Sequence, residues 1–193
     1  MPKVKMSEYL KSVTRGVQIK ADVLKSMFSD DSDMRYLSPL YIENGKILYN
    51  DLPGINLNVI DGNINMKYML RPRDIIICKS GTNIKASIAS DNPGNIVVGD
   101  SLFILRVIPD TIDPVYIAAY LQSDEGKKQL QLSCKGNNIS ASSVKEMWIY
   151  VPGPDGQQDI VDKYLKGEKA FYNYMKYQKM IQDYFDDDMD YRS

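Results

Sequence analysis

Leu70-Arg71-Pro72-Arg73-Asp74-Ile75-Ile76-Ile77-Cys78-Lys79-Ser80-Gly81-Thr82, residues 70–82, is the stretch that decides the fold of this chain. Its apolar centre, residues 75–78, is rich in β-branched side chains and lies between a proline and a glycine, which predicts a buried strand. A second apolar run at residues 101–106 predicts another strand after an intervening loop. The first strand therefore delivers cationic and hydroxyl side chains, but no catalytic set, to the loop at its end.

Further strands and a helix are predicted on either side of these two strands. One strand lies near residues 10–14, and Asn44-Gly45 is typical of a type I′ hairpin turn. Asp113-Pro114 is typical of a helix start, and we expect a single helix from there through Leu130. A last strand covers residues 148–151. Together these elements predict an α+β fold built on a mixed β-sheet.

The pattern changes after the proline-rich residues 152–156. We therefore expect a main domain at residues 1–155 and one long C-terminal α-helix at residues 156–193. Apolar residues recur in the helix at alternating steps of four and three, which makes a heptad-like seam. A helix of this length usually needs a partner for its seam, so we predict a role in dimerisation or subunit docking. The predicted interface residues are Ile160, Tyr164, Phe171, Tyr174, Ile181 and Phe185.

The composition narrows the class of function. The 193-residue chain has a net charge of -1, which excludes a strongly basic polyanion binder but allows a local basic surface. It contains no histidine, which removes the commonest general base and most zinc sites. Cys78 lies within an apolar strand, so we expect free thiols at Cys78 and Cys134. No apolar run is long enough for a membrane span and no signal-peptide core is seen, so we expect a cytoplasmic protein.

The common catalytic patterns are absent from the sequence. Asp74 and Lys79 suggest a metal-dependent nuclease, but the residue two before the lysine is Ile77 rather than an acid. The sequence contains neither a phosphate-binding Gly-rich loop nor the Asn/Asp-Pro-Pro-Tyr/Phe motif of adenine methyltransferases. We therefore expect a non-catalytic binding protein that uses no cofactor and no metal.

Five segments resemble, in the same order, motifs of the specificity subunits of type I restriction-modification systems. Pro72-Arg73-Asp74-Ile75 is similar to the family's Pro-Gly-Asp-Ile strand, with Arg73 in place of the glycine, and Ser80-Gly81-Thr82 is similar to the loop behind it. Residues 100–106 resemble the family's strand that ends in Leu-Arg. The other similar segments are Asp113-Pro114-Val115-Tyr116 with Tyr120-Leu121-Gln122-Ser123, Lys135-Gly136-Asn137-Asn138-Ile139, and Trp148-Ile149-Tyr150-Val151-Pro152.

The resemblance covers nearly the whole chain and implies a target-recognition domain followed by a long helix, without catalysis by the chain itself. A full specificity subunit of this family has two such units, whose helices pair antiparallel and set the spacing between two DNA half-sites. The implied function is sequence-specific DNA recognition by a specificity subunit or half-subunit, which directs a methyltransferase/endonuclease complex to its target. The implied partners are double-stranded DNA, an adenine methyltransferase subunit and, for a half-subunit, a second copy bound through the C-terminal helix.

Two polar loops carry the candidate DNA contacts. Phosphate contacts position a protein on DNA, whereas contacts to base edges specify the sequence. We assign phosphate or groove contacts to Arg15, Lys79, Lys85 and Lys135, and hydrogen-bonding roles to Ser80, Thr82, Asn137 and Asn138. In the alternative, Gly81-Thr82 and Gly136-Asn137 only shape the loops, because they recur in family members that read different sequences. The base readers would then lie within residues 56–67 or 85–95, where asparagine favours adenine.

Two other classes of function stay open. The first is a protein-interaction module with a degenerate recognition domain that acts through its C-terminal helix. The near-neutral charge of the main domain favours this reading, because net attraction to DNA is then small. The second is an enzyme such as a methyltransferase or nuclease, which the missing motifs disfavour.

Overall fold

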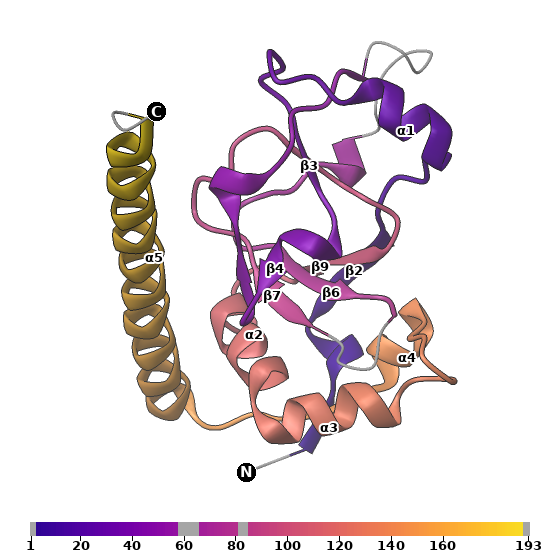
Figure 1. Ribbon diagram of the computed structural model, residues 1–193. Helices are drawn as coiled ribbons and strands as arrows, with labels where there is room; N and C mark the ends of the chain where they lie inside the picture. Colours follow the sequence, from indigo (N-terminus) through magenta and orange to yellow (C-terminus); the bar gives the residue numbers. More distant parts are fainter. Residues whose placement is uncertain (1–2, 58–65, 81–84, 191–193) are drawn as a thin grey trace.

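The computed structural model describes residues 3–57, 66–80 and 85–190. A β-rich domain occupies one side of the molecule, and the long helix α5 (Pro154–Asp190) stands beside it, with α2 (Pro114–Gln122) next to its lower part (Figure 1). The remaining helices are α1 (Ala21–Met27), α3 (Asp124–Leu132) and α4 (Ala141–Glu146). The α+β fold with one long C-terminal helix confirms the fold predicted from the sequence.

A four-stranded antiparallel sheet with the order β2-β9-β6-β7 forms the centre of the domain. Three two-stranded pairs surround it: β1–β10 and β4–β5 are antiparallel, and β3–β8 is parallel. The strands are β1 (Lys3–Lys5), β2 (Leu10–Arg15), β3 (Arg35–Leu37), β4 (Ile42–Glu43), β5 (Lys46–Ile47), β6 (Ile75–Cys78), β7 (Ala86–Ile88), β8 (Ile96–Val98), β9 (Leu102–Val107) and β10 (Trp148–Tyr150).

The strand β6 is apolar throughout because both of its faces are covered. Side chains alternate across a strand, so Ile75 and Ile77 point into the main core, which is closed by α2, α3, α4 and the base of α5. Ile76 and Cys78 point into a second core, which is closed by the β4–β5 hairpin and β8. A strand buried on both sides needs a continuous apolar run rather than an alternating one. The predicted strand at residues 75–78 and the buried free thiol of Cys78 are thus confirmed.

The turn between β4 and β5 has the geometry that the sequence predicts. Asn44 and Gly45 both have positive φ angles, 48° and 75°, as a type I′ turn requires. Ile42 pairs with Ile47 across the hairpin, and both side chains are fully buried. The hairpin therefore contributes buried side chains to the second core.

The single helix expected from Asp113 through Leu130 is wrong, because the chain forms two helices there. The Asp113 carboxylate caps α2 by accepting from the Val115 N–H, as the Asp-Pro start predicts. Ser123 then adopts an extended conformation, with φ -69° and ψ 163°, and its hydroxyl caps α3 by accepting from the Gly126 N–H at 3.2 Å. A Cβ on Gly126 would lie 1.9 Å from the Tyr120 carbonyl oxygen, so the two helices pack at a distance that only glycine permits.

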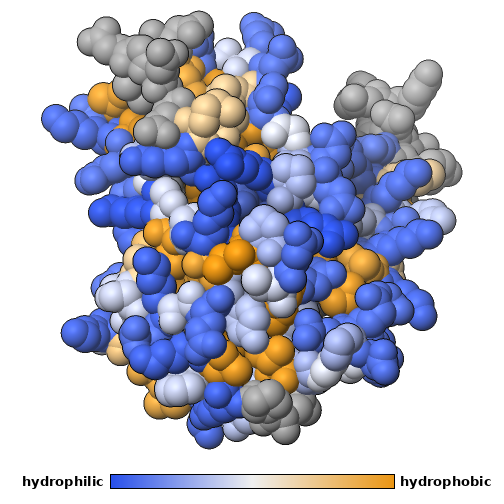
Figure 2. Space-filling view, turned by 180° about the vertical axis from the view of Figure 1, so that it is seen from behind, coloured by the Kyte–Doolittle hydropathy of each residue, from blue (hydrophilic) through white to orange (hydrophobic). Residues whose placement is uncertain are grey.

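The outer surface is mainly polar on the face seen from behind, where hydrophobic side chains form separate patches (Figure 2). Across the described parts of the chain, no helix is long and apolar enough to cross a membrane.

Candidate nucleic-acid interface

Arg15 and Lys79 meet at one end of the central sheet. Arg15 is the last residue of β2, Lys79 follows β6, and Asp100 precedes β9, which pairs with both strands. The Arg15 guanidinium donates to the Asp100 carboxylate at 2.8 Å and to the Asp100 carbonyl at 3.3 Å. The Lys79 ammonium donates to the same carbonyl at 2.9 Å. The strand register therefore brings together two cations from sequence positions 64 residues apart, as the difference between 79 and 15 shows.

This cluster is positively charged and partly open to solvent. One carboxylate faces two cations, and the Arg15 side chain is 47% exposed. Partial burial lowers the pKa of Lys79, the neighbouring Arg15 charge lowers it further, and Asp100 acts in the opposite direction. Cations held close together at a surface create a local positive potential even where net charge is near zero.

The second predicted polar loop joins the first through backbone hydrogen bonds. Lys135 and Asn138 close a tight turn by exchanging N–H to carbonyl bonds of 2.8 and 3.3 Å. The Ile139 N–H donates to the Lys79 carbonyl at 2.8 Å, and Ser80 forms a β-bridge with Asn138. The buried Ile139 side chain anchors the turn in the main core. Lys79 and Ser80 are thus continuous with the 135–138 turn at the end of β6.

The exposed residues of the 135–138 turn lie on this surface. Lys135, Asn137 and Asn138 are all exposed, and Gly136 supplies a positive φ of 60°. Six of the eight predicted DNA-contact residues therefore gather at one place: Arg15, Lys79, Ser80, Lys135, Asn137 and Asn138. Their backbone ladder makes this a preformed surface.

The other two predicted contact residues do not join this surface. The Lys85 ammonium turns to the β4–β5 hairpin and donates to the Ile42 carbonyl at 2.7 Å. Thr82 lies outside the described residues. The sequence prediction did not include Asp100, although its place just before a strand antiparallel to β6 puts it next to Lys79.

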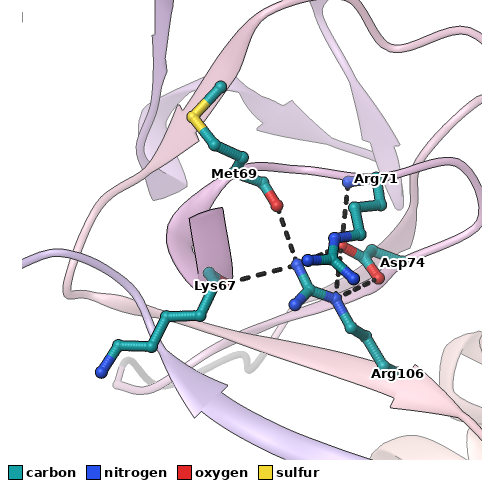
Figure 3. A network of polar contacts seen from close by, with 5 residues as sticks. All are labelled: Lys67, Met69, Arg71, Asp74 and Arg106. Carbon is teal, nitrogen blue, oxygen red and sulfur yellow. Dashed lines mark hydrogen bonds and ion pairs between the residues drawn. The ribbon is translucent and has the colours of Figure 1, made fainter. Parts of the chain in front are cut away.

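An ion pair buried at the other end of β6 and β9 explains two motif residues. Arg106 donates through Nε to both Asp74 carboxylate oxygens, at 3.0 and 3.3 Å, and through Nη2 at 3.1 Å (Figure 3). The Arg71 N–H donates to the same carboxylate at 2.9 Å, and Arg106 also donates to the Met69 carbonyl at 2.8 Å. Burial raises the pKa of Asp74, and the hydrogen bonds from Arg106 and Arg71 oppose this change. The pair therefore supports the fold and is closed to a ligand.

Arg73 occupies the position where the resembling family usually has glycine. The backbone conformation of Arg73 explains why glycine suits this position. Arg73 has a φ of 60°, in the left-handed region that glycine adopts without cost. Its side chain forms ion pairs with Asp91 at 2.8 Å and Asp113 at 3.7 Å. These contacts join the turn before β6 to the loop after β7 and to the start of α2.

The two stretches named as alternative base readers meet at an open pocket. Asn56 and Leu57 come from the first stretch and Asn95 from the second. Residues 32–34 and Ile55 complete the lining of this pocket of about 240 Å³. Most of the first stretch, residues 58–65, lies outside the described residues.

The predicted interface residues of α5 have different surroundings. Ile160 and Tyr164 pack against the main core of their own domain, and Phe171 is half-buried. Tyr174 and Ile181 are 58% and 50% exposed. The side chain of Phe185 lies outside the described side chains.

The helix face that meets the domain is rotated from the predicted seam. It runs through Ile160, Val161, Tyr164, Glu168 and Tyr172, and only Ile160 and Tyr164 belong to both sets. Heptad spacing could not separate these two adjacent faces, because each has apolar residues at steps of three and four.

No metal site is evident in the described ranges, where no group of three or more His, Cys, Asp or Glu side chains is placed to hold an ion. The groups that the surface at the end of β6 presents are cations, amides and a hydroxyl, on a backbone tied by hydrogen bonds.

No family model matches the chain, and no curated protein matches it in sequence. Solved structures do match its fold. One is a type I restriction-modification S subunit from M. genitalium, with a TM-score of 0.60 and 13% identity over 91% of this chain and 41% of that chain. Another belongs to work on complex assembly and conformational transition of the type I system, with a TM-score of 0.60 and 15% identity over 92% and 40%.

A third match is the HsdS subunit from Thermoanaerobacter tengcongensis, with a TM-score of 0.53 and 14% identity over 92% of this chain and 39% of that chain. This chain therefore shares the fold of type I restriction-modification S subunits over about nine tenths of its length. It spans about two fifths of the length of these neighbours.

Proposed function

We propose that this chain recognises a specific DNA sequence as a specificity subunit or half-subunit of a type I restriction-modification system. It directs a methyltransferase/endonuclease complex to its target and carries out no catalysis itself. The observation that carries this proposal is the fold shared with S subunits over about nine tenths of the chain. The preformed basic surface at the end of β6 supports it, because such a surface suits a DNA backbone.

In this proposal the surface at the end of β6 holds the DNA backbone. Arg15, Lys79 and Lys135 contact phosphates, while Asn137 and Asn138 donate hydrogen bonds from the exposed turn. Ser80 and Thr82 are hydrogen-bonding neighbours of these groups. Lys85 contributes less, because the Ile42 carbonyl already binds its ammonium.

Base reading is assigned to the pocket where the two less typical stretches meet. Asn56 and Asn95 line it, and an asparagine side chain can pair with the N6 and N7 edge of adenine. Asp33, which also lines the pocket, can accept from an exocyclic amine of cytosine. Specificity and backbone binding would then reside in separate parts of the domain.

The two proposed domains divide the work. Residues 1–155 read the DNA, and residues 156–193 form the helix that joins this unit to a second copy or to an adenine methyltransferase subunit. The exposed apolar side chains of Tyr174 and Ile181 support this assignment of the helix, and Phe171 beside them is half-buried. The proposal places the complex in the cytoplasm, where its DNA target lies.

Selection from a random pool of DNA duplexes at low salt tests the proposal. The full chain, alone or with the methyltransferase subunit, should enrich one sequence. Asn95→Ala should change the preferred bases, whereas Lys79→Ala should weaken binding to all sequences alike. Lys169→Ala, at an exposed lysine of α5, is the matched control. Failure to enrich any sequence under both conditions would refute the proposal.

A protein-interaction module is the second candidate function, and the exposed apolar residues of α5 favour it. Tyr174, Tyr177 and Ile181 are each at least half exposed on the described part of the helix. This alternative predicts self-association that Phe171→Asp abolishes, together with no DNA enrichment by the wild type. Sedimentation of both proteins at several concentrations, beside the duplex selection, separates the two functions.

A further inference from the structure

The helix α5 is attached to the domain at two neighbouring places, and Tyr164 takes part in both. Near its base, Ile160, Val161 and Tyr164 pack into the main core beside α2. About two turns further on, Glu168 and Tyr172 contact the β4–β5 hairpin. From residue 176 to 181 every side chain is exposed, and this part of the helix stands beside the domain up to its C-terminal end (Figure 1).

Lys46 of the hairpin makes the central contact at the second place. Its ammonium lies 3.6 Å from the centroid of the Tyr164 ring and 3.4 Å from the Glu168 carboxylate. The residue is only 7% exposed, which is unusual for a lysine. A buried ammonium is tolerated where a carboxylate and an aromatic face replace its lost water, and both of these partners come from α5.

Three further contacts surround Lys46 and join the same elements. Gln122 of α2 donates to the Gly45 carbonyl at 3.2 Å and to the Tyr164 hydroxyl at 2.8 Å. The Tyr172 hydroxyl donates to the Ile47 carbonyl at 3.0 Å. A Cβ on Gly45 would lie 2.2 Å from the Gln122 side-chain oxygen, so the hairpin turn is fitted closely to α2.

We propose that the β4–β5 hairpin, through Lys46, is a latch that fixes the direction in which α5 leaves the domain, and thereby the separation of the two DNA half-sites that a pair of these chains reads. Lys46 is a positioning residue in this scheme and does not touch DNA. The part that concerns half-sites rests on the proposed function, whereas the part that concerns the helix direction does not.

The length of α5 shows why a second attachment matters. At 1.5 Å per residue, Val161 lies about 16 Å from Tyr172 and about 44 Å from Asp190 along the helix. If α5 were attached only near its base, it could pivot there. The contacts with the β4–β5 hairpin fix the direction of the helix. A swing of about 10° at the base would move the far end by about 8 Å, which is roughly two base-pair steps of DNA.

Distances between two spin labels test the latch in the full chain without DNA. The labels are placed at Lys127→Cys on α3 and Lys176→Cys on α5, both exposed, with Cys134→Ser and an excess of unlabelled protein. Lys46→Met should broaden the distance distribution about twofold. Glu168→Gln should broaden it similarly, and the double variant should be no broader than either single variant, because both remove one interaction.

The control is Lys163→Met, which removes a lysine whose ion pair with Asp159 is exposed and lies within α5. It should leave the distribution unchanged. A narrow, wild-type distribution in folded Lys46→Met would overturn the latch. If Lys46→Met does not fold, Tyr172→Phe decides, since it keeps the ring and removes only the hydrogen bond to Ile47: broadening supports the latch and an unchanged width refutes it.

The half-site part is tested with duplexes that carry two copies of the sequence enriched by selection, separated by spacers that differ by single base pairs. Wild type should prefer one spacing. Lys46→Met should accept about two more base pairs on either side, with affinity for a single half-site unchanged within twofold. An unchanged spacing preference would refute this part. If wild type enriches no sequence, the proposed function fails, while the spin-label result still decides the latch.

Discussion

The two ends of the β6–β9 pair carry ion pairs of nearly equal length in opposite surroundings. At one end Arg106 lies 3.0 Å from Asp74, and the two side chains are 12% and 4% exposed. At the other end Arg15 lies 2.8 Å from Asp100, and the side chains are 47% and 31% exposed. Distance alone therefore does not reveal what an ion pair does. Burial separates a pair that supports the fold from a cluster whose charges stay in contact with water.

This difference follows from the cost of removing charges from water. A buried carboxylate without its partner is strongly unfavourable, whereas an exposed one is solvated at once. Arg106 cannot leave Asp74 to bind DNA without that cost. Arg15 and Lys79 incur no such cost, because water would solvate the Asp100 carboxylate if they moved to contact a phosphate.

Replacing Arg106 with alanine should show the largest effect. The change leaves Asp74 buried and unpaired, so unfolding free energy should fall by about 3–5 kcal/mol. Urea denaturation followed by circular dichroism measures it. Arg15→Ala, at the exposed end, is the matched control and should cost at most about 1 kcal/mol. Equal losses in the two variants would remove the distinction between the two ends.

Replacing Lys79 with alanine should affect binding more than folding. DNA affinity should fall for every sequence, and the dependence of log affinity on log salt should weaken by roughly one phosphate contact. Unfolding free energy should change by only about 1 kcal/mol, because one hydrogen bond to a carbonyl is lost. A salt titration by fluorescence anisotropy, with Lys169→Ala beside it, checks this. A loss confined to one sequence would mean that Lys79 reads bases.

Ser87 on β7 is a buried polar residue that, unlike Asp74, lacks a hydrogen-bond partner for its side chain in the described part of the chain. Its hydroxyl is fully buried. Ser87→Ala should therefore raise the unfolding free energy by about 1 kcal/mol. A thermal melt compares it with wild type. A loss of stability would indicate that the hydroxyl is bonded in solution.

Arg73 should show the smallest effect, although its ion pair with Asp91 is as short as that of Arg15. Arg73→Gly relieves a left-handed backbone but loses two surface ion pairs and adds freedom to the unfolded chain. These contributions nearly cancel, so unfolding free energy should change by no more than about 0.5 kcal/mol. Asp91→Ala, which keeps the strained backbone, separates the two effects in the same urea titration.

Features with local causes could be predicted from the sequence. The β6 strand, the Asn44-Gly45 turn, the Asp113 cap and the long α5 helix each follow from a short run of residues and its own chemistry. The bond from the Ile139 N–H to the Lys79 carbonyl was not predicted, because it joins segments that lie 60 residues apart in the sequence. The split between α2 and α3 was missed because Gly126 gains its role only when Tyr120 lies against it.

The sequence by itself determined the β6 strand, the hairpin turn, the long C-terminal helix and the absence of common catalytic patterns, because turn chemistry and apolar runs act over a few residues. Only the tertiary structure decided which charges are buried, since burial is the sum of contacts between distant segments. It set Asp74 against Arg106, grouped Arg15 with Lys79, and turned Lys85 away to the hairpin. In the same way it selected, from two adjacent apolar faces of α5, the one that packs on the domain.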